Sequence, residues 1–145
     1  MYEHLLVPVD GSDLSDRAMS ASIELARKLG ARITGFIAEP FALPPPGIGL
    51  GYAAAVTQHD AAVQSHANEV LAKFERLCSA AGVPFTPCTT QANQVEDAIV
   101  EAARTQGCDL IVMLTHGRGA LGELMWGSHT KNLLSRCTVP LLVLH

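Results

Sequence analysis

Short apolar runs alternate with longer amphipathic segments along the chain. The runs are rich in branched side chains and are bounded by glycine, proline or aspartate. This pattern is typical of strands that are buried on both faces of a parallel sheet. We expect five such strands, at residues 5–9, 31–38, 85–90, 110–114 and 139–144.

The first two segments between these runs carry apolar residues at helical spacing. Ser12 or Asp13 can cap the first helix at its amino end, and Gly30 is suited to end it. The second helix is expected over residues 57–81. Its predicted buried side consists of Val63, Val70, Leu71, Phe74 and Leu77.

Two further helices continue the alternation. One is expected over residues 93–106, and the other from Gly127 to about Arg136. Five strands that alternate with four helices predict a single α/β domain over residues 1–145. In such a domain, helices cover both faces of a doubly wound parallel sheet.

Residues 39–56 interrupt this regular pattern. The segment contains Pro40, three consecutive prolines at 44–46 and three glycines, so we expect an irregular insertion here. It is either a surface loop held by its own apolar side chains or a flap that lies near a ligand or a second subunit.

Composition narrows the class of protein. The chain has 145 residues, a net charge of -4 and 48% hydrophobic residues, which indicates one ordered domain without the basic excess of a nucleic-acid-binding protein. No apolar run approaches the roughly 20 residues that cross a bilayer, and the first residues lack a signal-peptide pattern. The four cysteines have no CxxC spacing, so free thiols are expected. We therefore expect a cytoplasmic protein with no nucleic-acid or membrane partner.

The stretch from Asp109 to Ser128 carries the candidate chemistry. A predicted strand is followed at once by the glycine-containing turn 115–119, and Gly127 and Ser128 open the next helix. Glycine lets a ligand approach the backbone, the first N–H groups of a helix lack partners within it, and the helix dipole favours negative charge there. The stretch therefore predicts a phosphate-binding loop.

Two common phosphate motifs match this stretch incompletely. Residues 117–122 have the GxGxxG spacing of a dinucleotide site, but the apolar run 141–144 stands where an acidic residue is expected about 20 positions later. Residues 122–127 have the spacing of a P-loop, but Ser128 and His129 replace its lysine and Ser/Thr. Neither motif accounts for the loop.

The loop resembles that of the universal stress protein family, Gly-x2-Gly-x9-Gly-Ser/Thr. Gly117 and the pair Gly127–Ser128 match this pattern, and Leu114 stands in place of its first glycine. Residues 4–12 resemble the first strand and turn of the family, and residues 138–144 resemble its last strand. The resemblance therefore covers the whole chain, in matching order and length.

The resemblance implies an adenine-nucleotide alpha hydrolase-like sheet in the order 3-2-1-4-5, with ATP or another adenine nucleotide at its switch point. Mg²⁺ would arrive with the nucleotide and be held largely by its phosphates. The glycines and Ser128 would cradle the phosphates. The residues that the resemblance and the loop together place at the ligand are Pro8, Asp10, Ile37, Met113, Leu114, His116, Gly117, Arg118, Gly119, Gly127, Ser128 and His129.

Two of these residues leave alternatives open. Asp10 either accepts from the ribose, lies near a bound cation, or is a turn aspartate bonded to its own loop. The side chain of Leu114 points either into the ligand crevice, where it would weaken binding, or into the core, where the site survives. Ile37 would offer backbone groups to the adenine edge, for which its side chain matters little.

No Ser/His/Asp set, metal-ligand cluster or carboxylate pair accompanies the loop, so we expect binding with at most slow hydrolysis. Three functions stay open: an ATP-binding regulatory module of the stress response, a dimeric interaction module that has lost tight ATP binding or prefers AMP or cyclic AMP, and a slow nucleotide-hydrolysing enzyme. The strand Val139–Leu144 is expected at a sheet edge, where the resemblance implies pairing across the two-fold axis of a homodimer.

Overall fold

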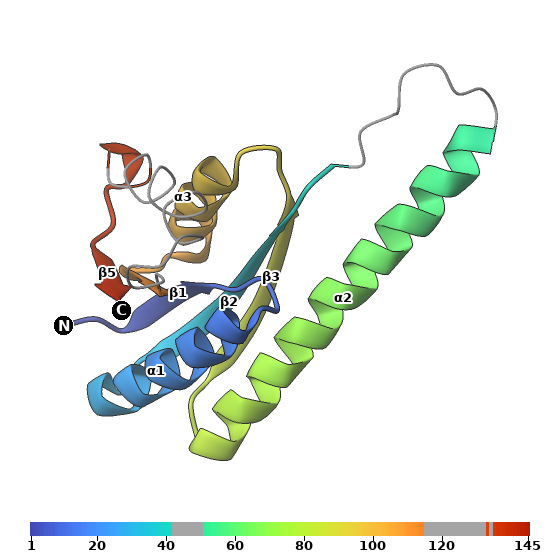
Figure 1. Cartoon of the computed structure of the whole chain (residues 1–145). Coiled ribbons are helices and arrows are strands. Elements are labelled where there is room, and N and C mark those ends of the chain that lie inside the picture. Colours follow the sequence, from blue (N-terminus) through green and yellow to red (C-terminus); the bar gives the residue numbers. More distant parts are fainter. Residues whose placement is uncertain (42–50, 115–132, 134) are drawn as a thin grey trace.

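The computed structural model describes residues 1–41, 51–114, 133 and 135–145 (Figure 1). The elements in these residues are β1 (His4–Pro8), α1 (Asp13–Leu29), β2 (Arg32–Glu39), α2 (Gly51–Ala81), β3 (Phe85–Gln91), α3 (Val95–Gln106), β4 (Leu110–Leu114) and β5 (Leu141–Leu144). The five predicted strands and the first three predicted helices are confirmed, with small differences at several ends. The predicted fourth helix lies mostly outside the described residues, although Leu133, Ser135 and Arg136 near its end are helical.

The five strands form one parallel sheet in the order β3-β2-β1-β4-β5, which confirms the predicted order. The chain leaves β1 toward β2 and β3, and then crosses back through α3 to β4 on the other side of β1. The connections that follow β1 and β4 therefore run in opposite directions. A crevice is expected between the carboxyl ends of two such strands.

Helices cover both faces of the sheet, as predicted: α1 and α2 pack on one face and α3 packs on the other (Figure 1). Side chains alternate between the two faces along each strand. In β1, Leu5 and Val7 face α1 and α2, whereas Leu6 faces α3, and all three are fully buried. This double burial explains why the strands are continuous apolar runs in the sequence.

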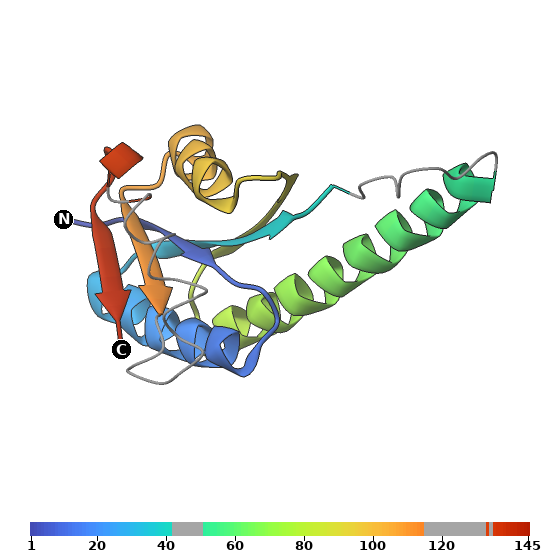
Figure 2. The same cartoon turned by 45° about the horizontal axis from the view of Figure 1, so that its top comes forward.

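The start of α2 differs from the prediction. The helix begins at Gly51, so residues 51–56 are helical instead of belonging to the irregular insertion. Residues 52–56 contain three alanines and no glycine or proline, and alanine is the strongest helix former. The amino-terminal part of α2 projects beyond the sheet (Figure 2). No helix in the described part of the chain is both long and apolar enough to cross a membrane.

The buried side of α2 also differs in part from the prediction. Val70, Leu71 and Phe74 are buried as predicted, but Leu77 is 39% exposed. Cys78, four residues after Phe74, takes the inward position of that turn and is fully buried. The predicted stripe was therefore wrong at Leu77, and Val63 at its amino end is only half-buried.

Gly35 lies in β2 beneath an aromatic pair that joins α2 to β3. A Cβ atom at Gly35 would lie 2.7 Å from the ring of Phe85 and 2.9 Å from that of Phe74. The two rings are in tilted contact, with their centroids 5.0 Å apart. The missing side chain of Gly35 therefore makes room for this contact.

Candidate functional site

A cavity of about 190 Å³ lies beside the carboxyl ends of β1, β2 and β4, on the face of the sheet that α3 covers. We refer to it as the α3-side cavity. Its lining consists of Pro8, Val9, Asp10, Phe36, Ala38, Val95, Glu96, Ile99, Met113 and Leu133. It lies at the switch point of the sheet, where the topology predicts a ligand.

The unequal lengths of the strands help to form this cavity. β2 pairs with β1 only as far as Phe36 but with β3 as far as Glu39. Space therefore remains beyond the end of β1, beside the last residues of β2. Pro8 and Met113 border this space because they share the α3 face of their strands with buried core residues.

Backbone groups of Ala38 adjoin the same space. The carbonyl of Phe36 accepts a hydrogen bond from the N–H of Val9, whereas the carbonyl of Glu39 accepts one from the segment after β3. Successive residues of a strand direct their backbone groups to opposite neighbours, so those of Ala38 point past the end of β1 and those of Ile37 point to β3. The geometry therefore favours Ala38 over Ile37 for the predicted backbone contact.

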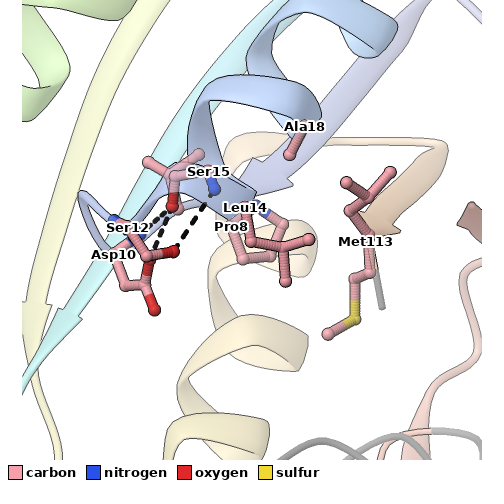
Figure 3. A pocket seen from close by; sticks show the side chains of 9 residues that line it. Pro8, Asp10, Ser12, Leu14, Ser15, Ala18 and Met113 are labelled. Carbon is pink, nitrogen blue, oxygen red and sulfur yellow. Dashed lines mark hydrogen bonds between the residues drawn. The ribbon is translucent and has the colours of Figure 1, made fainter. Parts of the chain in front are cut away.

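Leu114 lies on the opposite face of the sheet from the α3-side cavity. It is 7% exposed and packs against Leu14 and Ala18 of α1, with Leu144 of β5 beside them. Of the two orientations that the sequence left open for the Leu114 side chain, the structure therefore shows the one that points into the core. Leu114 lines a void whose surrounding side chains are drawn in Figure 3. The volume of this void is only about 20 Å³, which is room for about one water molecule.

Asp10 follows β1, and its carboxylate is bonded within its own turn (Figure 3). Its Oδ1 accepts the N–H of Ser12 at 3.0 Å, the hydroxyl of Ser12 at 2.6 Å and the hydroxyl of Ser15 at 2.6 Å. Gly11, with a φ of 85°, supplies the left-handed backbone of this turn. The structure therefore shows the hydrogen bonds of the turn aspartate, and the contact of Asp10 with a ribose or a cation stays a prediction.

The electrostatics of the turn favour an ionised carboxylate. Burial raises the pKa of Asp10, but the hydrogen bonds from Ser12 and Ser15 outweigh burial and hold the pKa below its usual 3.8. Among the described residues of the cavity lining, Asp10 and Glu96 carry the ionisable side chains. The cavity is therefore apolar with two acidic groups, which suits a neutral ligand moiety that carries hydrogen-bond donors.

The structure brings some of the predicted site residues together. Pro8, Asp10 and Met113 line one cavity, whereas Ile37 and Leu114 have their side chains in the clusters on the other face. The predicted phosphate-loop residues lie outside the described part of the chain: His116, Gly117, Arg118, Gly119, Gly127, Ser128 and His129. The loop itself stays a prediction.

Several cavity residues were missed from the sequence. Phe36 and Ala38 could have been found, because the alternation of β2 places them on one face near its carboxyl end. Glu96 gave no such signal, because acidic residues are common in the first turn of any helix. Within the described residues, no group of three or more His, Cys, Asp or Glu side chains could hold a metal ion.

Comparison with known proteins agrees with the resemblance seen in the sequence. The model described as "Universal stress protein family" matches residues 1–145. The chain belongs to the universal stress protein family. The universal stress protein in the QAH/OAS sulfhydrylase 3′ region of Thermus aquaticus is 28% identical over 143 residues, which cover 99% of this chain and 98% of that relative.

Solved universal stress proteins share the fold. One from Burkholderia pseudomallei is 26% identical, with a TM-score of 0.77 and coverage of 99% of this chain and 96% of that one. Another was solved in complex with cAMP. It is 23% identical, with a TM-score of 0.70 and coverage of 99% of this chain and 97% of that one.

Proposed function

We propose that this universal stress protein binds an adenine nucleotide, with the base and ribose in the α3-side cavity and the phosphates at the predicted loop 115–128. The cavity carries the proposal, because it is a mostly apolar space at the switch point of the sheet, with Pro8 and Met113 in its wall and Asp10 beside them. A protein of the same family and fold was solved with cAMP, which supports the class of ligand.

The size of the cavity supports this division of the ligand. Pockets that enclose a drug-sized ligand usually measure about 300–1,000 Å³. A cavity of about 190 Å³ suits a base and part of a sugar, so the phosphates would lie outside it. The strand β4, which the loop follows in the sequence, contributes Met113 to the wall of the cavity.

The position of Leu114 also supports binding. Its side chain packs against α1 and does not line the α3-side cavity. The departure from the glycine pattern at this residue therefore leaves the space for the base open.

We propose that the nucleotide acts as a signal in the stress response, by changing the interactions of the protein, with little or no catalysis. The described lining of the cavity contains no histidine, cysteine or lysine, and the carboxylate of Asp10 is bonded within its turn. Mg²⁺ would be held largely by the phosphates of ATP. The family structure solved in complex with cAMP favours a second candidate ligand, cAMP or AMP, whose single phosphate needs less of the loop than a triphosphate does.

The proposed assembly is a homodimer formed through β5. This strand is the last at one edge of the sheet and pairs with β4. Its four residues, Leu141–Leu144, are all partly exposed in the single chain. An apolar edge strand of this kind is suited to pairing with a second copy across a two-fold axis.

Calorimetric titration with ATP, AMP, cAMP and GTP tests the proposed binding. We expect heat from the adenine nucleotides and weaker or no heat from GTP. Ala38→Leu, which adds three carbon atoms to the cavity wall, should weaken binding by about tenfold, as overpacking does. Ala54→Leu on the exposed part of α2 is the matched control and should leave binding unchanged.

Two results would contradict the proposal. The absence of binding for all four nucleotides would refute the ligand assignment. Sustained phosphate release from Mg-ATP above about 1 s⁻¹, an ordinary rate for an enzyme, would refute the non-catalytic role.

A further inference from the structure

Glu96 is the acidic side chain that α3 contributes to the α3-side cavity. It lies in the first turn of α3 and lines the cavity together with Val95 and with Ile99 of the next turn. Glu96 is half-buried, whereas its neighbour Asp97 is exposed and forms an ion pair with Arg136. The first turn of α3 therefore places one carboxylate at the cavity and the next one on the surface.

The rest of the wall is mostly apolar. Pro8, Phe36 and Met113 line the cavity from the sheet, and Ile99 lines it from α3. Such surfaces suit the flat faces of a heterocycle, whose polar edge then needs hydrogen-bond partners because burial removes water from it. An ionised carboxylate can only accept hydrogen bonds, so Glu96 would favour an edge that carries N–H donors.

We propose that Glu96 is a specificity-determining residue, which accepts a hydrogen bond from the 6-amino group of a bound purine. This inference rests on the proposed function, because it requires the base to occupy the α3-side cavity. A 6-oxo purine would place a carbonyl oxygen against the carboxylate, where two acceptors repel each other. A carboxylate has about four acceptor positions, so Glu96 can receive the amine and keep its interactions within the chain.

Charge in the cavity supports the same orientation of the ligand. Asp10 and Glu96 both line the cavity, and the pKa of Asp10 is held low, so that carboxylate is ionised near neutral pH. The negative charge of Asp10 disfavours a phosphate inside the cavity and favours the donor-bearing base. The phosphates are then directed outward.

Calorimetric titration of the full chain with AMP and with IMP tests the role of Glu96, because these ligands differ only on one edge of the base, with an amino or an oxo group at position 6 and a hydrogen on N1 in IMP alone. The wild-type protein should prefer AMP by roughly tenfold or more, the value of one hydrogen bond to a charged group. Glu96→Gln should reduce this preference to about twofold or less, because an amide can either donate or accept. Glu101→Gln makes the same change on the exposed side of α3 and should keep the wild-type preference.

The outcomes separate the two proposals. If AMP and IMP bind the wild-type protein equally, or if Glu96→Gln keeps the full preference, the role of Glu96 is refuted and nucleotide binding stands. If neither ligand binds, both proposals are refuted. Should Glu96→Gln fail to fold, Glu96→Asp, which withdraws the carboxylate by one methylene group, must lower the preference in the same way.

Discussion

Ser15 and Asp10 are joined by a reciprocal pair of hydrogen bonds. The Ser15 hydroxyl accepts the N–H of Asp10 at 2.8 Å and donates to Oδ1 of the same residue at 2.6 Å. Ser15 is 4% exposed and lies in the first turn of α1. The pair therefore fixes the end of β1, which borders the α3-side cavity, to a helix that packs on the opposite face of the sheet.

Replacing Ser15 by alanine should destabilise the fold and loosen this turn. The change removes this pair of hydrogen bonds, and a third one that the Ser15 hydroxyl accepts from the N–H of Gly11, from a buried position. We therefore expect the free energy of unfolding to fall by about 1–3 kcal/mol. It should also raise the pKa of Asp10, because one of the bonds that lower it is lost. Urea unfolding and NMR titration of the Asp10 carboxyl group measure the two effects.

Ser20→Ala is the matched control for this experiment. Ser20 lies on the same helix and is exposed. Within the described part of the chain, its hydroxyl donates a hydrogen bond only to the carbonyl of Asp16. Its loss should change stability by less than about 0.5 kcal/mol. Equal effects of the two variants would show that the link between Ser15 and Asp10 contributes nothing of its own.

Truncating Leu114 should affect stability but not ligand binding. Leu114→Ala leaves a hole between β4 and α1, and such changes in a core cost about 2–5 kcal/mol. Because Leu114 does not line the α3-side cavity, the affinity for AMP should stay within about twofold, well below the tenfold change that 1.4 kcal/mol produces. Urea unfolding and calorimetry measure the two quantities. Markedly tighter binding by the variant would mean that Leu114 intrudes on the nucleotide site.

His4 should make the fold sensitive to mild acid. It is 5% exposed, and its Nε2 shares a hydrogen bond with Oγ1 of Thr34 at 2.7 Å. Burial, aided by the nearby Arg32 guanidinium, lowers the pKa of His4 below its usual 6.5, against the opposing charge of Asp109. As the pH falls through 6.5, the unfolded chain therefore takes up the proton first, and the free energy of unfolding decreases until the pH passes below the folded pKa.

The test compares urea unfolding at about pH 7.5 and pH 5.5, a range that spans the ordinary histidine pKa. The free energy of unfolding of the wild-type protein should be lower at the acidic pH than at the higher pH, and that of His4→Gln should fall by a smaller amount. His59→Gln, at an exposed position of α2, should behave as the wild type. A His4→Gln variant with the full wild-type loss would show that His4 is not the group responsible.

Much of the fold could be predicted from the sequence because strands that are buried on both faces appear in it as continuous apolar runs. The run Leu110–Leu114 is apolar throughout because its side chains are buried on both faces of the sheet, and the structure confirms the strand. The start of α2 was predicted less well, since the glycines and prolines before Gly51 suggested that irregular structure continued to residue 56. Local helix preference determined that boundary, and the packing pattern did not.

The candidate site was predictable only in part, because a cavity wall is assembled from separate elements. The turn at Asp10 and the end of β4 at Met113 were identified from motifs that lie within short stretches. Glu96 reaches the cavity only because the first turn of α3 lies beside the carboxyl ends of the strands, with the helix in one particular rotation about its axis. The sequence gives the apolar stripe of a helix, but not which polar residue at the edge of that stripe meets a cavity.

The proposed dimer leads to a test in the backbone of β5. The N–H of Ile111 donates to the carbonyl of Pro140, so Pro140, Leu142 and Leu144 direct their backbone groups to β4. By alternation, the N–H of Val143 points away from the sheet, toward a paired second copy. Val143→Pro should therefore remove a hydrogen bond between subunits while the pairing of β5 with β4 is kept.

Light scattering coupled to size exclusion is expected to show a dimer for the wild-type protein and a shift toward monomer for Val143→Pro at micromolar concentration. Leu142→Pro is the matched control, because it removes an N–H that points to β4 instead of one that points away from the sheet. It should lower the free energy of unfolding by more than Val143→Pro does, since proline is poorly tolerated where a ladder hydrogen bond is made. A wild-type chain that stays monomeric would refute the proposed homodimer. A Val143→Pro variant that stays fully dimeric would place the subunit contact elsewhere than the outer edge of β5.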